Sequence, residues 1–304
     1  MKDKKKKKHI CIDAKSFLVK ERNIMVANVV RINKLVFLFL GFLGVVIVYF
    51  LINLNPVAMS SEHTSSKLHK RITWHNQAFV NVPTEIVEAA KSISVNSEMI
   101  EMVYQSENIV ISTKEAVPKK MPKVEVLLLH GAAFSSQNWQ DIGTLQFLAA
   151  AGYQAVAIDL PGKGKSTKIS VTDGGDFLDK VIDLVDMNNP VIISPSMSGM
   201  YSLPFLMDSA GKRLKSSIGY VPIAPVFTEN YTKKEYSKLK IPTMIVCGSL
   251  DVSLGPVSTK NLKQLPNSEV FILEGAGHPA YLTHTDAFHR LLYNFLLSIA
   301  SSQN

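Results

Sequence analysis

Short, largely apolar runs recur between helical patterns from residue 124 onward, and this alternation limits the chain to few folds. The apolar residues are continuous rather than alternating, which indicates strands buried on both faces, as in a parallel sheet. Alternating strands and helices predict a doubly wound α/β domain, with a mostly parallel central sheet and helices on both faces. The runs are Val124–Leu129, Ala155–Ile158, Val191–Ser194, Ile218–Val221, Thr243–Cys247 and Val270–Leu273, and the helical patterns span 144–151, 177–187 and 286–300.

Two segments before these runs show a different period. Apolar residues alternate with polar ones around Ile100–Val103 and Asn108–Ser112. Period-2 segments separated by a few residues are typical of a β-hairpin. We therefore expect an antiparallel hairpin to open the domain.

Three residue types with complementary chemistry follow three of these runs. Ser196 follows the third run, Asp251 the fifth and His278 the sixth. Ligands of such sheets gather at the carboxyl ends of the strands, so these side chains are expected to meet there. The order Ser, Asp, His along the chain is that of the α/β-hydrolase catalytic triad.

A serine hydroxyl becomes a good nucleophile only when a neighbouring base removes its proton. We assign Ser196 as the nucleophile and His278 as that base. Asp251 is assigned to hold the imidazole in the right tautomer and to stabilise its charged form. The turn that carries such a nucleophile needs small residues two positions before and after it. Here these are Ser194 and Ser198, where glycine is usual.

An oxyanion hole requires two N–H donors near the nucleophile. The first is predicted to be the backbone N–H of Met197, directly after Ser196. The second is expected from the loop after His130-Gly131, at Ala132. Loss of one such donor typically costs about 2.7 to 4 kcal/mol of transition-state stabilisation.

Other chemistry-bearing residues receive structural interpretations. His130 is predicted to shape the oxyanion loop and Asp159 to organise the loop after its strand. The stretch Gly162–Ser166 lacks the spacing of a phosphate-binding Walker loop. No metal ligands and no required cofactor are predicted, and Cys247 is interpreted as core packing.

The positive charge of the chain is concentrated at its amino terminus. The first 34 residues carry 11 of the 33 Lys and Arg residues and three of the 25 Asp and Glu residues, which leaves 22 of each sign for the remainder. The main domain therefore gives no compositional support for nucleic-acid binding. We interpret residues 1–34 as a basic cytosolic tail.

Residues 35–54 form an uncharged, apolar stretch of 20 residues, which is long enough for a helix to cross a bilayer. The preceding cations predict a cytosolic amino terminus, hence a single-pass type II signal anchor and a lumenal or extracellular hydrolase domain in the secretory pathway. A cleaved signal peptide is the competing interpretation, although the basic segment and the apolar run are both long for one. Residues 55–97 are expected to form a stalk and 98–304 the catalytic domain.

One N-glycosylation sequon, Asn230-Tyr231-Thr232, is present. It lies in the short insert 228–240, which is too short to build a lid domain. Asn230 is a glycosylation site only if the domain is lumenal, as the predicted topology requires.

Four motifs give the chain a recognisable family likeness. The segments 127–131, 155–162, 194–206 and 275–279, with the Ser-Pro-Ser-Met-Ser-Gly elbow as the most specific, resemble the α/β-hydrolase domain-containing protein 14 group. The resemblance covers roughly residues 99–298. It implies a serine hydrolase acting on small acyl esters, and more weakly lysine deacylation with acyl transfer to coenzyme A. The signal anchor makes the chain similar to the membrane-anchored branch of that group.

These observations give one leading functional hypothesis and two alternatives. The leading one is hydrolysis of small acyl esters or amides through an acyl-Ser196 intermediate. The alternatives are acyl transfer to coenzyme A, in the manner of a lysine deacylase, and a binding module with a vestigial hydrolase site. The sequence leaves the oligomeric state and the physiological acyl donor open.

Overall fold

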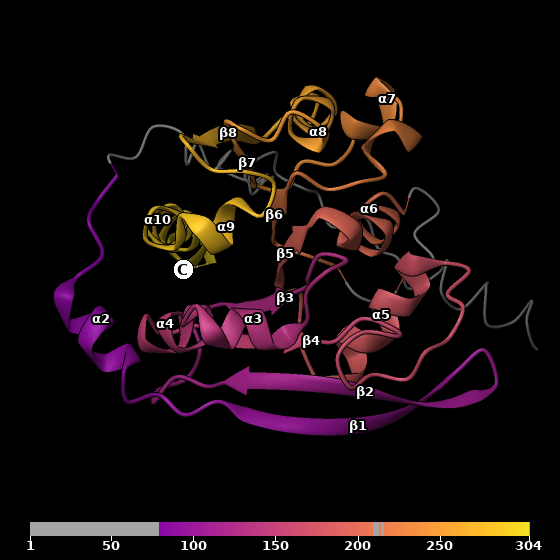
Figure 1. The fold of residues 1–304 in the computed structure, drawn as a ribbon, viewed down its shortest axis with the longest axis horizontal. Helices are drawn as coiled ribbons and strands as arrows, with labels where there is room; N and C mark the ends of the chain where they lie inside the picture. The colour runs from indigo at the N-terminus through magenta and orange to yellow at the C-terminus, as the bar shows by residue number, and fades with distance from the viewer. Residues whose placement is uncertain (1–78, 209–212, 214–215, 304) are drawn as a thin grey trace, which may run out of the picture. The chain divides into compact units, whose positions relative to one another are not determined.

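The computed structural model describes residues 79–303, apart from 209–212 and 214–215. An eight-stranded sheet with the order β1-β2-β4-β3-β5-β6-β7-β8 forms the centre of this part of the chain (Figure 1). Strands β3 to β8 are parallel to one another, and β1 and β2 add an antiparallel edge beside β4. The strands are β1 Asn96–Tyr104, β2 Glu107–Ala116, β3 Glu125–Leu128, β4 Gln154–Ile158, β5 Val191–Pro195, β6 Gly219–Ile223, β7 Thr243–Gly248 and β8 Ser268–Leu273.

The six predicted apolar runs correspond to β3 through β8, each within two residues at either end. The predicted hairpin is also confirmed. Tyr104 pairs with Glu107, so only Gln105 and Ser106 form the turn. Both have positive φ, +50° and +68°, as the two central residues of a type I′ hairpin turn require.

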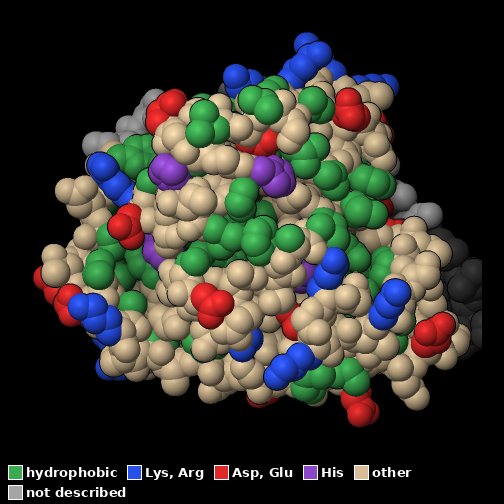
Figure 2. Space-filling model, in the orientation of Figure 1, with side chains coloured by type: hydrophobic (Ala, Val, Ile, Leu, Met, Phe, Trp, Pro, Cys, Tyr) green, Lys and Arg blue, Asp and Glu red, His purple; other side chains and the backbone are tan. Residues whose placement is uncertain are grey.

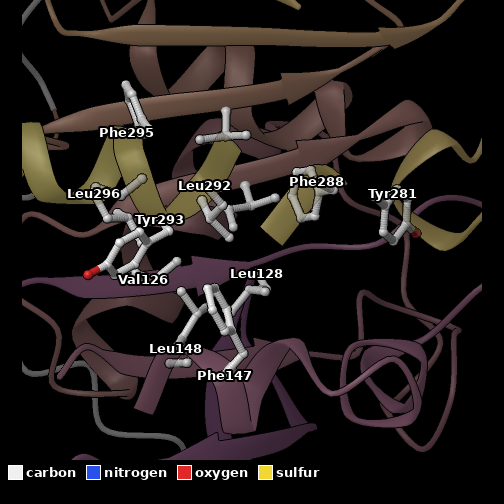
Figure 3. Close-up of a cluster of buried hydrophobic side chains, with 14 of the residues drawn as sticks. Val126, Leu128, Phe147, Leu148, Tyr281, Phe288, Leu292, Tyr293, Phe295 and Leu296 are labelled. Atoms are coloured by element: carbon white, nitrogen blue, oxygen red, sulfur yellow. The ribbon is translucent and has the colours of Figure 1, made fainter. Parts of the chain in front are cut away.

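Helices cover both faces of the sheet (Figure 1). On one face, α3, α4, α9 and α10 pack with β3 into a first core cluster, part of which is drawn in Figure 3. On the other face, α5, α6, α7 and α8 contribute to a second cluster with Ile109 and Ile111 of β2. The helices are α2 Thr84–Ala90, α3 Ser136–Asp141, α4 Thr144–Ala150, α5 Gly174–Leu184, α6 Gly199–Leu206, α7 Lys233–Tyr236, α8 Leu254–Leu262, α9 Ala280–Thr283 and α10 Thr285–Gln303, with 3-10 turns η2 Ser196–Ser198 and η3 Thr228–Asn230.

Packed structure begins earlier than the predicted boundary between stalk and domain at 97/98. Helix α2 contacts α4. Val82, Ile86, Ile93 and Val95 pack against the first core cluster. Residues 84–93 show a short amphipathic pattern, but the rest of this segment has no sustained period, which is why residues 79–97 are predicted as part of the stalk.

The basic tail 1–34, the apolar stretch 35–54 and residues 55–78 lie outside the described residues. Among the helices of the described part, none combines the length and the apolar character needed to span a bilayer. The predicted signal anchor therefore stays a prediction.

Candidate active site

Ser196 lies at the turn between β5 and α6, where the chain reverses sharply. Its φ of +51° falls in the left-handed region, which non-glycine residues rarely adopt. The backbone carbonyl of Ser196 accepts a hydrogen bond from the N–H of Val226, 3.0 Å away, which ties the turn to the segment after β6. At Gly199, a Cβ atom would collide with the carbonyl oxygen of Val226, so this position requires glycine. A strained, partly exposed serine at a strand end is the local geometry of a nucleophile elbow.

His278 connects Ser196 to Asp251. Its Nε2 lies 2.8 Å from the Ser196 Oγ, and its Nδ1 lies 2.6 Å from the Asp251 Oδ2. The three residues come from the loops after β5, β7 and β8, as the sequence predicts. The geometry matches a hydroxyl, a base and an orienting carboxylate joined by two hydrogen bonds.

The Asp251 carboxylate divides its two oxygens between different tasks. While Oδ2 faces His278, Oδ1 accepts hydrogen bonds from the N–H groups of Ser253 and Leu254, both at 3.2 Å, at the start of α8. The Ser253 hydroxyl adds a third, at 3.0 Å. Burial alone would raise the pKa of Asp251, but the hydrogen bonds from His278 and Ser253 outweigh it and bring this pKa below its usual value. The carboxylate is therefore charged at neutral pH.

The loops that carry Asp251 and His278 are tied to each other. The N–H of Leu250 donates to the carbonyl of Ala276 at 2.9 Å, and the N–H of Gly275 donates to the Ser249 hydroxyl at 2.9 Å. Each bond joins a residue near Asp251 to a residue near His278. The distance between carboxylate and imidazole thus depends on backbone contacts as well as on the side chains.

The loop after β3 presents Ala132 to the site. The Gly131 carbonyl accepts from the N–H of Phe134 at 3.1 Å and contacts the His130 Nδ1 at 2.9 Å. In a trans peptide the N–H points opposite to the carbonyl, so the Ala132 N–H faces away from these partners. Met197 is the second residue of the turn η2 Ser196–Ser198, directly after the nucleophile, and the first N–H groups of such a turn lack intrahelical acceptors. Ala132 and Met197 therefore stay the predicted oxyanion donors.

His130 fixes this loop to the loop after β4. Its Nε2 accepts from the N–H of Leu160 at 2.9 Å, so the proton of the neutral ring is on Nδ1 and is donated to Gly131. Burial lowers the pKa of His130, which keeps the ring neutral at physiological pH. The structural role predicted for His130 is confirmed.

Two further contacts join the same pair of loops. The Lys163 ammonium donates to the Ala132 carbonyl at 2.7 Å, a contact that the sequence did not reveal. The buried Asp159 carboxylate accepts from the N–H groups of Ser136 at 2.7 Å and Lys165 at 2.9 Å, which confirms its predicted role as a loop organiser. Gly164 has φ +50°, and a Cβ there would overlap the Asp159 carboxylate. The stretch 162–166 therefore wraps around Asp159 and directs Lys163 to Ala132.

A cavity of about 150 Å³ opens beside Ser196 and His278. Its remaining lining is largely apolar: Gly131, Ala132, Ala133, Phe134, Pro195, Ile223, Pro279 and Tyr281. The Tyr281 ring stacks on Trp139 with centroids 4.4 Å apart, and the Trp139 indole N–H donates to the Leu129 carbonyl at 2.7 Å. One wall of the cavity is thus fixed to the end of β3.

Hydrophobic side chains gather in the middle of the molecular face drawn in Figure 2. Exposed apolar residues that neighbour site residues in the chain include Met200, Leu250 and Val252.

Asn230, the predicted glycosylation site, is exposed at the end of η3. Within the described residues, no group of three or more His, Cys, Asp or Glu side chains could hold a metal ion.

The family model and the relatives that match this chain agree on the class of protein. A family model described as the alpha/beta hydrolase family matches residues 126–229. A Rattus norvegicus protein named "Putative protein-lysine deacylase ABHD14B" is 45% identical over 213 residues, which is 67% of this chain and 99% of that protein. The human protein named ABHD14A is 43% identical over 194 residues, 62% of this chain and 70% of that protein.

Solved structures show the same fold at low identity. A crystal structure of a predicted CIB-like hydrolase from Thermoplasma acidophilum has a TM-score of 0.59 and 22% identity, and covers 67% of this chain and 99% of its own. The carboxylesterase CesB from Bacillus subtilis has a TM-score of 0.55 and 15% identity, over 70% of this chain and 97% of its own. The fold and the relatives define an α/β hydrolase. Within this class, the chain belongs to the ABHD14 group.

Proposed function

We propose that this protein is a serine hydrolase that cleaves small acyl esters or amides through an acyl-Ser196 intermediate. The observation that carries the proposal is the pair of hydrogen bonds that joins Ser196, His278 and Asp251 beside an apolar cavity. His278 would take the proton of Ser196 as the hydroxyl attacks the acyl carbon, and would then deliver it to the leaving group. Water would release the acyl group in a second step that repeats this proton transfer.

The N–H groups of Ala132 and Met197 would stabilise the oxyanion of each tetrahedral intermediate. The orientation of the Gly131–Ala132 peptide, set by Phe134 and His130, supports the assignment of Ala132. Donors that are held in place before substrate arrives are worth more than donors that must reorient.

The size of the cavity supports a preference for short acyl chains. Ligand pockets for larger molecules commonly span about 300 to 1,000 Å³, whereas about 150 Å³ suffices for a six-carbon ring. The segment between β6 and β7 contains only the 3-10 turn η3 and the four-residue helix α7, so no lid domain extends the cavity. Acetyl to hexanoyl groups are therefore the proposed substrates.

Deacylation of lysine side chains is the second candidate. It is supported by the name of the rat relative, which is 45% identical to this chain. An acyl-lysine amide presents the same small acyl group as the esters, and the triad chemistry cleaves both. Coenzyme A would act here only as the acceptor that takes the acyl group from Ser196 in place of water.

Turnover of p-nitrophenyl esters of increasing chain length tests these proposals. We expect activity on the acetyl and butyryl esters, a steep decline beyond hexanoyl, and loss of activity in Ser196→Ala. Equal rates for the wild type and Ser196→Ala would indicate a binding module with a vestigial site. An increase in turnover upon addition of coenzyme A, with formation of acyl-coenzyme A, would favour acyl transfer over hydrolysis.

We further propose that residues 35–54 anchor the protein as a single-pass type II membrane protein, with the domain lumenal and Asn230 glycosylated. The uncharged stretch and the preceding lysines support this topology. Protease protection in sealed microsomes, with a tag at each end, tests it. A digested carboxyl-terminal tag beside a protected amino-terminal tag would overturn the orientation.

A further inference from the structure

Four buried hydroxyl groups form a continuous chain beneath the nucleophile elbow. The Oγ of Ser194 lies 2.9 Å from that of Ser198 and 2.7 Å from that of Ser202, and the Ser202 Oγ lies 3.0 Å from the Tyr220 hydroxyl. All four residues have no exposed surface. The chain therefore links β5, the elbow, α6 and β6 without contact with solvent.

The direction of every hydrogen bond in this chain follows from its last member. The Ser198 hydroxyl donates to the Pro195 carbonyl at 2.8 Å, so it has no second proton for Ser194 and must accept from it. Ser194 must then accept from Ser202. By the same reasoning, Ser202 accepts from Tyr220. The protons thus point one way, from Tyr220 to the carbonyl of the residue before Ser196.

The Tyr220 hydroxyl, which donates the first hydrogen bond of this series, keeps its proton. Burial raises the pKa of Tyr220, so its hydroxyl stays protonated across the range in which proteins are usually studied. A buried chain of hydrogen bonds with one direction also polarises its members and strengthens each bond. Each hydroxyl is satisfied only while its neighbours are present, so the four groups act as a unit.

Two bonds of the chain close the strained turn that carries the nucleophile. Ser194 and Ser198 lie two residues before and after Ser196, whose φ is +51°. Their direct bond, together with that from Ser198 to Pro195, spans the residues that must stay close for this φ to persist. Strained backbone persists only where surrounding contacts over-determine it.

We propose that this hydroxyl chain holds the elbow in the conformation that directs the Ser196 Oγ at His278. Ser194, Ser198, Ser202 and Tyr220 are positioning residues, since none of them hydrogen-bonds His278 or Asp251 in the described structure. The serines at 194 and 198 thus do more than satisfy a need for small side chains. This inference rests on the proposed function, because it concerns the placement of the proposed nucleophile.

The double variant Ser194→Gly/Ser198→Gly separates the two explanations. It places glycine at the two positions where glycine is usual in this elbow, so a requirement for small size alone predicts unchanged catalysis. Our proposal predicts about a tenfold decrease in the acylation rate with p-nitrophenyl acetate, because small displacements of a nucleophile have large kinetic effects. KM should stay within about twofold, since the cavity wall is unaltered, and the apparent pKa of the activity should not move.

Two single variants complete the design. Tyr220→Phe removes only the first donor and keeps the ring, so it should fold and slow acylation less than the double variant. Ser298→Ala is the matched control: Ser298 is buried and its hydroxyl also donates to the carbonyl three residues earlier, but it lies in α10. It should leave acylation unchanged.

Rates are compared at 25 °C, with the melting temperature of each variant recorded. Wild-type acylation in the folded double variant would overturn the proposal, as would an equal loss in Ser298→Ala. If the wild type itself does not react, the proposed function fails, and crystal structures then decide the positioning role. A Ser196–His278 distance near 2.8 Å and a positive φ at Ser196, both retained in the double variant, would contradict the proposal.

Discussion

The Lys163 ammonium lies 2.7 Å from the carbonyl oxygen of Ala132, and this contact joins the loop after β4 to the loop that is predicted to form the oxyanion hole. It fixes the plane of the Ala132–Ala133 peptide, which directly follows the peptide that carries the Ala132 N–H. The ammonium therefore restrains the backbone of the loop whose Ala132 N–H is a predicted oxyanion donor.

We predict that Lys163→Met lowers kcat by about tenfold while the melting temperature changes by no more than a few degrees. The methionine keeps much of the aliphatic stem and removes the ammonium donor. Lys165→Met is the control, because only the backbone N–H of Lys165 contacts Asp159. Steady-state kinetics with p-nitrophenyl acetate measure both. Identical kcat values for Lys163→Met and the wild type would exclude this role.

The same substitution should impair activity at one buried aspartate and stability at another. Asp251→Asn should lower kcat by on the order of 10³- to 10⁴-fold, because an amide cannot hold the histidine in the required tautomer. Its effect on the free energy of unfolding should be smaller than that of Asp159→Asn. In that variant an amide N–H₂ replaces one of the oxygens that accept from Ser136 and Lys165, which should cost about 1 to 3 kcal/mol.

Urea denaturation and ester turnover, measured on both variants, test this contrast. Loss of activity in Asp159→Asn at a temperature where it is fully folded, comparable to the loss in Asp251→Asn, would show that the roles are not separable. So would full activity of Asp251→Asn.

The partly buried imidazole of His289 should make the fold less stable in acid. Burial lowers the pKa of His289 to about 4, while the unfolded chain titrates near 6.5. Between these values the unfolded state binds a proton that the folded state does not, so the free energy of unfolding decreases as the pH falls from about 6.5 to 4, by up to about 3 kcal/mol. His130, whose pKa is also lowered, contributes in the same direction.

The variant His289→Gln removes one of these imidazoles. Its new side-chain amide can still approach the Thr144 hydroxyl, which is the partner of His289 at 2.9 Å. Denaturation at pH 7, 6, 5 and 4 should show a shallower pH dependence than in the wild type. Superimposable pH dependences would contradict the assignment of a neutral imidazole to His289 in the folded state.

The cavity wall should set the acyl-chain preference. Phe134 lines the cavity and is only partly buried, so Phe134→Ala should enlarge the cavity at moderate cost in stability. We predict that the preferred p-nitrophenyl ester becomes longer by two or more carbons. Phe227→Ala is the control, because Phe227 is exposed and does not line this cavity. An unchanged chain-length profile in Phe134→Ala would indicate that the acyl group binds elsewhere.

The sequence predicted the sheet well because parallel strands are buried on both faces and leave unbroken apolar runs. It also predicted which strand ends carry Ser196, Asp251 and His278, since each follows its run within a few residues. Helix α8 was not predicted. Its sequence contains Gly255 and Pro256, and its first turn is stabilised by hydrogen bonds to Asp251, a residue outside the helix.

The contacts that support the site could not be predicted from local pattern. Tyr220 is an aromatic residue in a buried strand, and nothing in its neighbourhood reveals that its hydroxyl meets Ser202 on α6. Lys163 reaches Ala132 only because the loop wraps around Asp159. Such contacts depend on the relative placement of distant segments, which periodicity and spacing do not encode.

The residue that a fluorophosphonate probe modifies shows directly whether Ser196 is the nucleophile. The purified domain is incubated with the probe, digested and analysed by tandem mass spectrometry, with Ser196→Ala and heat-denatured wild type as controls. We predict one adduct, on Ser196, that is absent from both controls. An adduct on another residue, or an unmodified wild type that is demonstrably folded, would contradict the assignment of Ser196 as the nucleophile.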